Sequence, residues 1–479
     1  MSKDGSKVGS GATGAQVGRV VLQIALPLEG AKEPASPAEG DRSRPSQDAT
    51  PAGERRRRKR KWYTLYDKVF ALRNLQQAWE KVRANKGAPG CDGQSVEQFG
   101  AKAEAELQAL HEQLKSKRYR PRPVKRVEIP KSGGGKRRLG IPAVRDRVVQ
   151  QAVLQILQPI FEAKFSEYSH GFRPDRGCAT ALNIVDRALR CGYEWIVDAD
   201  IESFFDAVDH ELLLTAVNEE IADGSVLRLI RMFLESGVMV GGGEVEPTEL
   251  GTPQGGPLSP LLANIYLHPL DVAMQEGGFG LVRYADDFVI FTKTRERAEE
   301  ALAVARGILE SLKLRLHPAK TRIAAIDEGF DFLGFHYFRD SKGNLQKTVS
   351  RRSRARFREQ IRKRTRRHAG QKRPKPRRCN ARRLKGNQRV VEMTERVNAY
   401  LRGWHWYFKA VRTTWRDYFE GFDGFVRRRI RCAISGRYAK GHWQSTLSNE
   451  VLEEIGYVGL SALQERHLRG QLLAPPLSG

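Results

Sequence analysis

The chain contains 479 residues, of which 40% are hydrophobic and 29% charged, and its formal net charge is +27. This composition favours a globular protein of two or three domains and argues against a membrane-spanning one, because no apolar run approaches the roughly 20 residues that a bilayer requires. The five cysteines form no CxxC pair, which argues against a zinc ribbon or a disulfide framework and fits a reducing cytoplasm.

Residues 1–60 are expected to form a disordered basic extension. The first part is rich in Gly, Ser, Ala and Pro without periodicity, and it lacks the apolar core of a secretory signal. We therefore expect a bacterial-type cytoplasmic protein, whose charge is compatible with association with the nucleoid. The run RRRRKRK at 55–61 has two interpretations, an arm that contacts nucleic acid and a solubilising linker.

Order is predicted to begin at Trp62 with a helix. One apolar stripe of that helix is formed by Leu65, Val69, Leu72, Leu75 and Trp79. From Val127, the segment VEIPKSGGGKRRLGIP predicts two short extended arms joined by a glycine-rich turn. A further helix is predicted from Val144, where apolar residues recur at helical spacing.

The segment from 194 to 316 predicts strands that alternate with helices. In EWIVDADIESFF, Trp195 and alternate residues after it point to one face, and Asp198 and Asp200 point to the other. LVRYADDFVIF at 281–291 predicts a hairpin, and AEEALAVARGILESLKLRL an amphipathic helix that runs into a strand. The expected fold class is therefore α+β with a mostly antiparallel sheet.

A strongly basic segment follows. Residues 351–389 hold 19 Lys or Arg and one acid, Glu359, which favours a polyanion such as nucleic acid as partner over a merely solvated tail. After it, YLRGWHWYF at 400–408 predicts helices whose aromatic side chains form a core rather than a stacking surface.

The hairpin raises the question of two adjacent carboxylates, Asp286 and Asp287, between apolar arms. A turn that uses Asp for local backbone hydrogen bonds would explain them. However, another strand ends at Asp200, and if the two strands are neighbours, three carboxylates converge. Each repulsion is then about 4 kcal/mol at about 4 Å and an effective dielectric near 20. Divalent cations such as Mg²⁺ would relieve it.

Four motifs in order change this interpretation. SHGFRP at 169–174, DADIESFFDAVDH at 198–210, GTPQGGPLSPLLANIYL at 251–267 and YADD at 284–287 resemble the reverse transcriptases encoded by group II introns. The resemblance runs from about Trp62 to about Phe425.

The resemblance implies a domain layout. A right-hand polymerase with fingers and an antiparallel palm sheet would occupy residues 61–340. An all-α basic thumb or maturase domain would follow at 341–425, and a C-terminal helical segment, with DNA binding as its expected role, at 426–479.

The resemblance also implies roles for single residues. Catalysis and metal binding fall to Asp200, Asp286 and Asp287. Nucleotide binding falls to Lys136, Arg137, Phe205, Gln254 and Lys320, with Arg138 as a further triphosphate contact. Contacts with RNA or the template–primer are expected from Gly255, Gly256, Arg362, Arg366, Arg367, Arg377, Arg378, Arg382 and Arg383.

Two of these roles have a specific physical content. Phe205 would collide with a ribose 2′-hydroxyl and so select deoxynucleotides, although Phe204 beside it is an alternative gate. Lys320 would donate a proton to the departing pyrophosphate. Arg283, next to the YADD motif, receives no role. The sequence departs from many relatives at Glu202 and Ser203, where they have Lys-Gly.

The implied function is RNA-directed DNA polymerisation with two Mg²⁺ ions, with binding of intron RNA and assistance to its splicing and mobility. Partners would be intron RNA, an RNA template, a DNA primer or target, and deoxynucleotides. The Cys and His ligands of the family's nuclease are missing, so target cleavage by this chain is not expected. Two alternatives stay open, a domesticated enzyme in DNA repair or phage defence and an RNA-binding maturase that only assists splicing.

Overall fold

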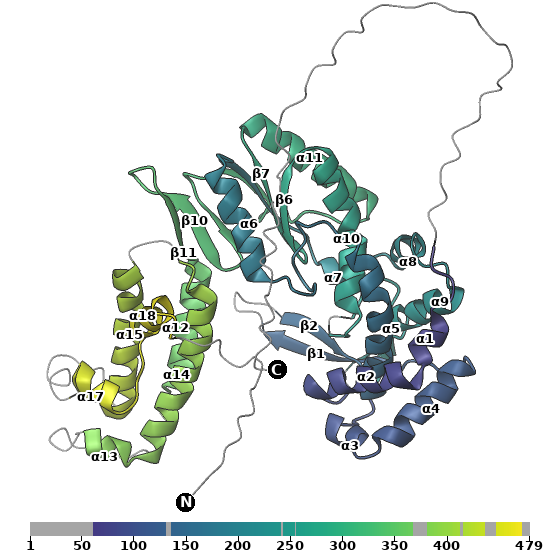
Figure 1. Cartoon of the computed structure of the whole chain (residues 1–479), viewed down its shortest axis with the longest axis horizontal. Coiled ribbons are helices and arrows are strands. Elements are labelled where there is room, and N and C mark those ends of the chain that lie inside the picture. Colours follow the sequence, from purple (N-terminus) through teal and green to yellow (C-terminus); the bar gives the residue numbers. More distant parts are fainter. Residues whose placement is uncertain are drawn as a thin grey trace, which may run out of the picture. The chain divides into compact units, whose positions relative to one another are not determined.

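The computed structural model describes residues 61–130, 136–240, 243–253, 255–366, 381–411, 415–435 and 447–471. These residues form an α+β fold with mostly antiparallel sheets and a helical C-terminal region, as the sequence predicts (Figure 1). The basic extension predicted at 1–60 lies outside the described residues. Among the described helices, none has the length and hydropathy that a bilayer span requires.

The N-terminal part consists of helices around one β-hairpin. Its elements are α1 (Tyr66–Phe70), α2 (Leu72–Ala84), α3 (Val96–Gly100), α4 (Ala103–Lys115), β1 (Val124–Pro130), β2 (Lys136–Ile141) and α5 (Val144–Glu162). The single helix predicted after Trp62 is wrong in detail, because Ala71 leaves the helical conformation at ψ 128° and separates α1 from α2. The predicted stripe is therefore interrupted, and Leu72 is 36% exposed.

The middle of the chain supplies the central sheet and its helices. Its elements are α6 (Cys178–Arg190), β3 (Trp195–Asp200), α7 (Phe204–Ala207), α8 (His210–Asn218), α9 (Gly224–Leu234), β4 (Val238–Met239), β5 (Val245–Glu246), α10 (Ser259–Glu276), β6 (Gly280–Tyr284), β7 (Asp287–Thr292), α11 (Arg295–Ser311) and β8 (Arg322–Ala325). The central sheet has the strand order β6-β7-β3-β8, and a second sheet has the order β2-β1-β4-β5.

The two faces of the central sheet differ as the alternation in the sequence predicts. Val197 and Ala199 of β3 are paired with Ile290 and Phe288 of β7, and all four belong to the main hydrophobic core. Helices α10 and α11 pack against this sheet (Figure 1). Ile196, Asp198 and Asp200 alternate with these residues and lie on the other face of β3, away from that core, and Asp200 is paired there with Asp287 of β7.

A three-stranded sheet and a group of helices complete the described fold. Their elements are β9 (Phe330–Phe332), β10 (Phe335–Arg339), β11 (Leu345–Val349), α12 (Arg351–Arg364), α13 (Ala381–Lys385), α14 (Gln388–Phe408), α15 (Trp415–Ser435), α17 (Asn449–Glu454) and α18 (Leu460–Leu468). The aromatic cluster forms a core between helices, since the Trp404 ring centroid lies 4.7 Å from that of Phe357 and 4.6 Å from that of Phe408.

The predicted domain boundaries fall inside structural elements. Residue 340 lies in the turn of the β10–β11 hairpin, and residue 425 lies within α15. Helix α18 packs against α14 and α15, and buried Asp423 of α15 accepts bonds from the backbone N–H groups of Leu460 and Ser461 at 2.7 and 3.0 Å. The helices on both sides of residue 425 therefore form one packed group.

Candidate active site

Strands β3 and β7 bring two of the predicted acids side by side. The antiparallel register pairs Asp200 with Asp287, and that between β6 and β7 pairs Tyr284 with Asp287. Only Ala285 and Asp286 lie between β6 and β7, so the middle two residues of the YADD motif form a two-residue hairpin turn. Ala285 has φ +59°, which such tight hairpin turns favour. Acids that are 86 and 87 residues apart in the chain therefore meet at one end of the sheet.

The electrostatic environment of these acids is unfavourable for charge. Burial raises the pKa of Asp287 to about 7, and the carboxylates of Asp198, Asp286 and Asp200 contribute to that rise. The pKa of Asp198 rises to about 6, mainly through burial, although Arg322 opposes the shift. A group of carboxylates with raised pKa values at a strand end is typical of a functional site rather than a simple turn.

Strand β8 and the segment before it bring cations to the acids. The Lys320 ammonium donates to Oδ2 of Asp200, and Nε of Arg322 lies 3.7 Å from Oδ2 of Asp198. Lys320 thus contacts one of the predicted catalytic acids. An ammonium bound to this carboxylate also shows that the position accepts a cation.

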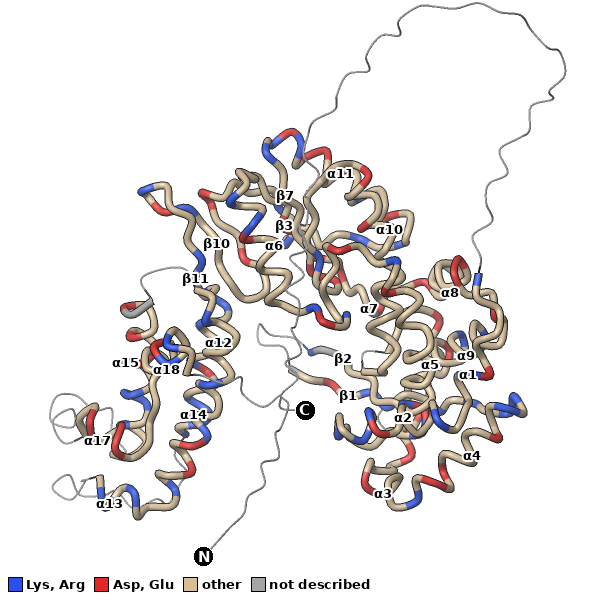
Figure 2. Tube along the Cα trace, viewed as in Figure 1, with Lys and Arg blue, Asp and Glu red and all other residues tan. Residues whose placement is uncertain are grey.

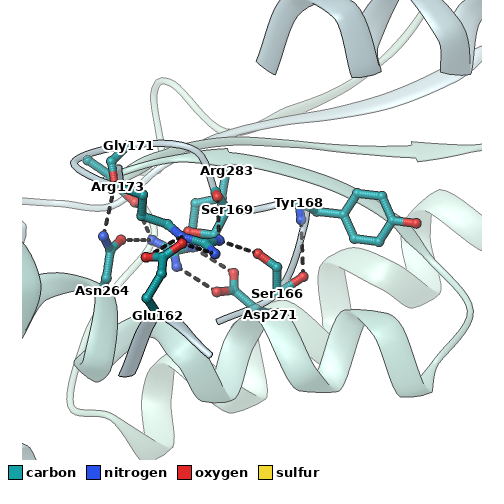
Figure 3. Close-up of polar contacts among 10 residues, drawn as sticks. Glu162, Ser166, Tyr168, Ser169, Gly171, Arg173, Asn264, Asp271 and Arg283 are labelled. Atoms are coloured by element: carbon teal, nitrogen blue, oxygen red, sulfur yellow. Dashed lines mark hydrogen bonds and ion pairs between the residues drawn. The ribbon is translucent and has the colours of Figure 1, made fainter. Parts of the chain in front are cut away.

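A buried polar network that the sequence did not predict lies beneath the turn (Figure 3). Arg283 of β6 is fully buried, and its Nε and Nη2 donate to Oδ1 and Oδ2 of Asp271 on α10 at 2.6 and 2.5 Å. Its Nη1 donates to Oδ1 of Asn264 at 3.1 Å and to the carbonyl oxygen of Ala285 at 2.9 Å. The one available signal was a charged residue inside an apolar strand, since buried Arg requires a partner.

The SHGFRP segment is hydrogen-bonded to Arg283 and Asn264 of the same network. The backbone N–H of His170 donates to the Arg283 carbonyl at 2.8 Å, and Nδ2 of Asn264 donates to the Gly171 carbonyl at 2.9 Å. A Cβ on Gly171 would lie 2.3 Å from the backbone nitrogen of Ala285. Glycine is therefore required for this segment to approach the turn.

The comparisons with known proteins agree with this geometry. Residues 129–337 match the family model described as reverse transcriptase (RNA-dependent DNA polymerase). Protein YkfC of Escherichia coli (strain K12) is 37% identical over 306 residues, which cover 55% of this chain and 80% of YkfC. The chain belongs to the reverse transcriptase family. Its enzymatic class is therefore RNA-directed DNA polymerase.

Further relatives specify the branch of the family. The group II intron-encoded protein LtrA of Lactococcus lactis subsp. cremoris is 42% identical over 197 residues, which cover 40% of this chain and 32% of LtrA. Nuclear intron maturase 1, mitochondrial, of Arabidopsis thaliana is 38% identical over 94 residues, which cover 20% of this chain and 13% of that protein. The chain is thus of the group II intron reverse transcriptase and maturase type, and it spans about a third of LtrA.

The predicted gate residue of this reverse transcriptase borders two cavities. One, of about 540 Å³, is lined by Phe205 together with Gly255 and Gly256, and by residues of α2, β2 and α5. The other, of about 270 Å³, lies between Phe205, the β1–β2 hairpin and the segment 247–253. Phe204 and Phe205 are both buried, 2% and 8% exposed, and both belong to the main core, but Phe205 is the one that lines these two cavities. This arrangement favours Phe205 over Phe204 as the gate.

The predicted glycine positions have little space for a side chain. Gly255 has φ +141°, and a Cβ there would lie 2.4 Å from the carbonyl oxygen of Gly140. A Cβ on Gly256 would lie 2.4 Å from Oε1 of Gln150. Close packing against the β2 backbone and the positive φ therefore explain the glycine at 255, whereas Gly256 faces the end of the Gln150 side chain of α5.

The other predicted nucleotide contacts are only partly described. Lys136, at the start of β2, is exposed and its Nζ lies 2.5 Å from Oε2 of Glu128 on β1. Arg138 lines the smaller cavity. Gln254 and the side chain of Arg137 lie outside the described residues.

The predicted RNA-contacting arginines are exposed where the structure describes them. Figure 2 shows Lys and Arg along α12, whose apolar residues Phe357 and Ile361 are buried. Arg362, Arg366, Arg382 and Arg383 are exposed. Arg367, Arg377 and Arg378 lie outside the described residues.

The acids fit a divalent metal as a partial ligand set. No three His, Cys, Asp or Glu side chains form a ready-made metal cage in the described part of the chain. Mg²⁺ is commonly held by one or two carboxylates while substrate phosphates and water complete its coordination. Burial raises the pKa of Asp287 to about 7, so a cation beside it would favour its charged form, and Oδ2 of Asp200 already accepts a bond from a cation, the Lys320 ammonium.

Proposed function

We propose that this chain extends a DNA primer on an RNA template by nucleotidyl transfer with two Mg²⁺ ions at Asp200 and the Asp286–Asp287 turn. The observation that carries the proposal is the register pair Asp200–Asp287 next to a two-residue turn. Mg²⁺, when bound there, would neutralise the carboxylates and polarise the reacting hydroxyl and phosphate oxygens. In this proposal residues 61–340 are the fingers and palm, and the helices after them are the thumb.

The chain's own residues would orient the reactants. Lys320, bonded to Asp200, would donate a proton to the departing pyrophosphate. The Phe205 ring would exclude a 2′-hydroxyl, while Gln254 and the backbone of Gly255 would contact the incoming nucleotide and the template. Basic residues of β2 would hold the triphosphate, for which Arg is suited because its guanidinium can bind two oxygens at once. Positioning and electrostatic stabilisation would supply most of the rate acceleration.

The test is primer extension by the double variant Asp286→Asn plus Asp287→Asn. We expect extension on an RNA template to be lost while RNA binding is retained. Glu299→Gln plus Glu300→Gln is a matched control, since it neutralises two adjacent acids on the exposed face of α11. Normal extension by the aspartate variant would refute the mechanism.

We further propose that the helices after β11 bind the host intron RNA and assist its splicing and mobility. Exposed basic residues on α12 and α13 surround aromatic and aliphatic cores, a pattern suited to phosphate contacts that do not depend on base sequence. Such contacts predict that RNA affinity falls steeply with salt concentration. Replacing Arg362, Arg366, Arg382 and Arg383 by Gln should flatten that dependence, and an unchanged salt slope would argue against phosphate contacts there.

Splicing assays separate this proposal from the alternatives. Splicing that persists in the aspartate variant would show that RNA assistance does not require the acids. If the wild-type protein extends primers but neither binds nor splices a group II intron RNA, a domesticated polymerase in DNA repair or phage defence is favoured. If it splices without extending primers, the protein is a maturase alone.

A further inference from the structure

We propose that Arg283, held by Asp271 and Asn264, is a positioning residue that fixes the backbone of the Ala285–Asp286 turn and thereby sets the turnover rate. The inference rests on the proposed function of the acids in that turn. It adds a residue that contacts neither substrate nor metal and acts only through the turn.

The hydrogen bonds of Arg283 connect three elements. Its guanidinium forms a two-point ion pair with Asp271 of α10, and both side chains are 0% exposed. The remaining nitrogen, Nη1, donates to Asn264 of α10 and to the Ala285 carbonyl. One side chain on β6 therefore contacts Asp271 and Asn264 of α10 (Figure 3) and also the Ala285 carbonyl in the turn that carries the acids.

The turn needs such support because its backbone is strained. Ala285 has φ +59°, and a residue with a Cβ adopts this left-handed region less readily than glycine does. The bond from Arg283 to the Ala285 carbonyl opposes this strain by holding the peptide in place.

The SHGFRP segment holds the same turn from another direction. Arg283 and Tyr168 are joined by a backbone bond from the Arg283 N–H to the Tyr168 carbonyl at 2.9 Å. Asn264 bonds both Arg283 and the carbonyl of Gly171, and Gly171 lies against the Ala285 backbone. Asn264 is therefore the side chain that couples the guanidinium to this second support.

Burial distinguishes this role from substrate binding and from simple stabilisation. A fully buried guanidinium cannot contact a nucleotide or template. A buried ion pair often stabilises a fold no better than apolar residues of similar volume would. The geometry of the acid-bearing turn is what this ion pair provides and an apolar replacement would not.

The test compares Arg283→Lys and Asn264→Ser with the control Lys347→Met. Lys347 of β11 is also buried, its side chain 2% exposed, and its Nζ lies 3.4 Å from Oδ2 of Asp186 on α6. Its ammonium also lies over the rings of Phe335 and Tyr337, outside the turn and its supports. The control therefore reports the loss of a buried cation–carboxylate pair elsewhere in the fold.

Steady-state primer extension gives the first readout. In Arg283→Lys we expect kcat to fall by about 10- to 100-fold, since displacements near 1 Å can change rates by that factor, while the nucleotide KM changes less than about twofold. Asn264→Ser should lower kcat in the same direction, and it covers the case in which Arg283→Lys does not fold. Lys347→Met should leave kcat close to the wild-type value.

Hydrogen–deuterium exchange of the metal-free proteins gives a second readout that needs no activity. Exchange should accelerate in peptides spanning residues 281–291 for the Arg283 and Asn264 variants, and in peptides spanning 345–349 for the control. Wild-type kcat in folded Arg283→Lys, or unchanged exchange at 281–291, would overturn the inference. Absence of extension by the wild-type protein would instead refute the proposed function, and the exchange data would still test the positioning role.

Discussion

Replacing Asp287 by Asn is predicted to stabilise the metal-free protein at alkaline pH. The pKa of this carboxyl is about 7 in the fold, raised from an ordinary value of 3.8 by burial and by neighbouring carboxylates. When folding raises the pKa of a carboxyl, that group does not destabilise the fold below its unfolded pKa, because it is protonated in both states. As pH rises from the unfolded pKa to the folded pKa, the unfolded state ionises first and the protein loses stability. The wild-type protein should therefore lose stability between about pH 4 and 7.

The magnitude follows from the size of the shift. At about 1.36 kcal/mol for each pKa unit, a rise of this size corresponds to about 4 kcal/mol above pH 7. Partial exposure of the side chain and screening by counterions reduce that figure, so we expect about 2 kcal/mol. Asp287→Asn removes the ionisable group. The free energy of unfolding of this variant should therefore exceed that of the wild-type protein by about 2 kcal/mol at pH 8, and the two values should differ little at pH 4.5.

Urea unfolding in the presence of a chelator, at pH 4.5 and pH 8, measures this difference. Asp209→Asn is a control of opposite sign, because the hydrogen bond with Lys313 lowers the pKa of Asp209. Stability from Asp209 is present above its unfolded pKa of 3.8 and is lost only below it, so that variant should be destabilised by a similar amount at pH 8 and pH 4.5. If Asp287→Asn is instead less stable than wild type at pH 8, or shows the same difference at both pH values, the assigned electrostatics are wrong.

Three further predictions concern packing. Phe205→Ala should raise ribonucleotide incorporation at least about tenfold relative to deoxynucleotides, whereas Phe204→Ala should mainly lower the unfolding free energy, by about 3–5 kcal/mol. Equal discrimination between the two kinds of nucleotide in both variants would argue against Phe205 as the gate. Gly255→Ala should impair extension, because its Cβ would meet the Gly140 carbonyl oxygen, and full activity in this variant would contradict the described conformation. Asp423→Ala should lower the unfolding free energy by about 2–3 kcal/mol, since it removes the acceptor for the α18 N-terminus, and unchanged urea unfolding would contradict that capping role.

The parts of the fold that the sequence predicted are those with local signals. Alternation in β3 and a short turn between two apolar arms are visible within a dozen residues, and both are present in the structure. The break at Ala71 was missed, because α1 and α2 each continue the apolar spacing on their own side of it. Periodicity identifies faces, and it does not reveal a single residue that leaves the helical conformation.

The support beneath the acids could not be predicted in this way. Asp271 and Arg283 are 12 residues apart, on a helix and a strand whose packing is set by the whole core. A single Asp in a mostly apolar helix has many explanations, and its partner becomes evident only when α10 is placed against β6. The resemblance to a family assigned roles to residues within its motifs, and Asp271 lies outside every motif that carried the resemblance.

The turn between β6 and β7 brings together repulsion among the acids Asp200, Asp286 and Asp287 and a buried ion pair, Arg283 with Asp271. The acids at the open end of the sheet repel one another, and their carboxyls gain stability only when a cation joins them. The buried pair of Arg283 and Asp271 has compensated charges, so it can hold the turn without neutralising the acids that it supports. A lysine or arginine pointing directly at the acids would relieve the repulsion but would occupy their oxygens, as the Lys320 ammonium occupies Oδ2 of Asp200. Positioning through the backbone carbonyl of Ala285 does not place the Arg283 guanidinium on those oxygens. The acids therefore remain available to a cation while their geometry is fixed from below.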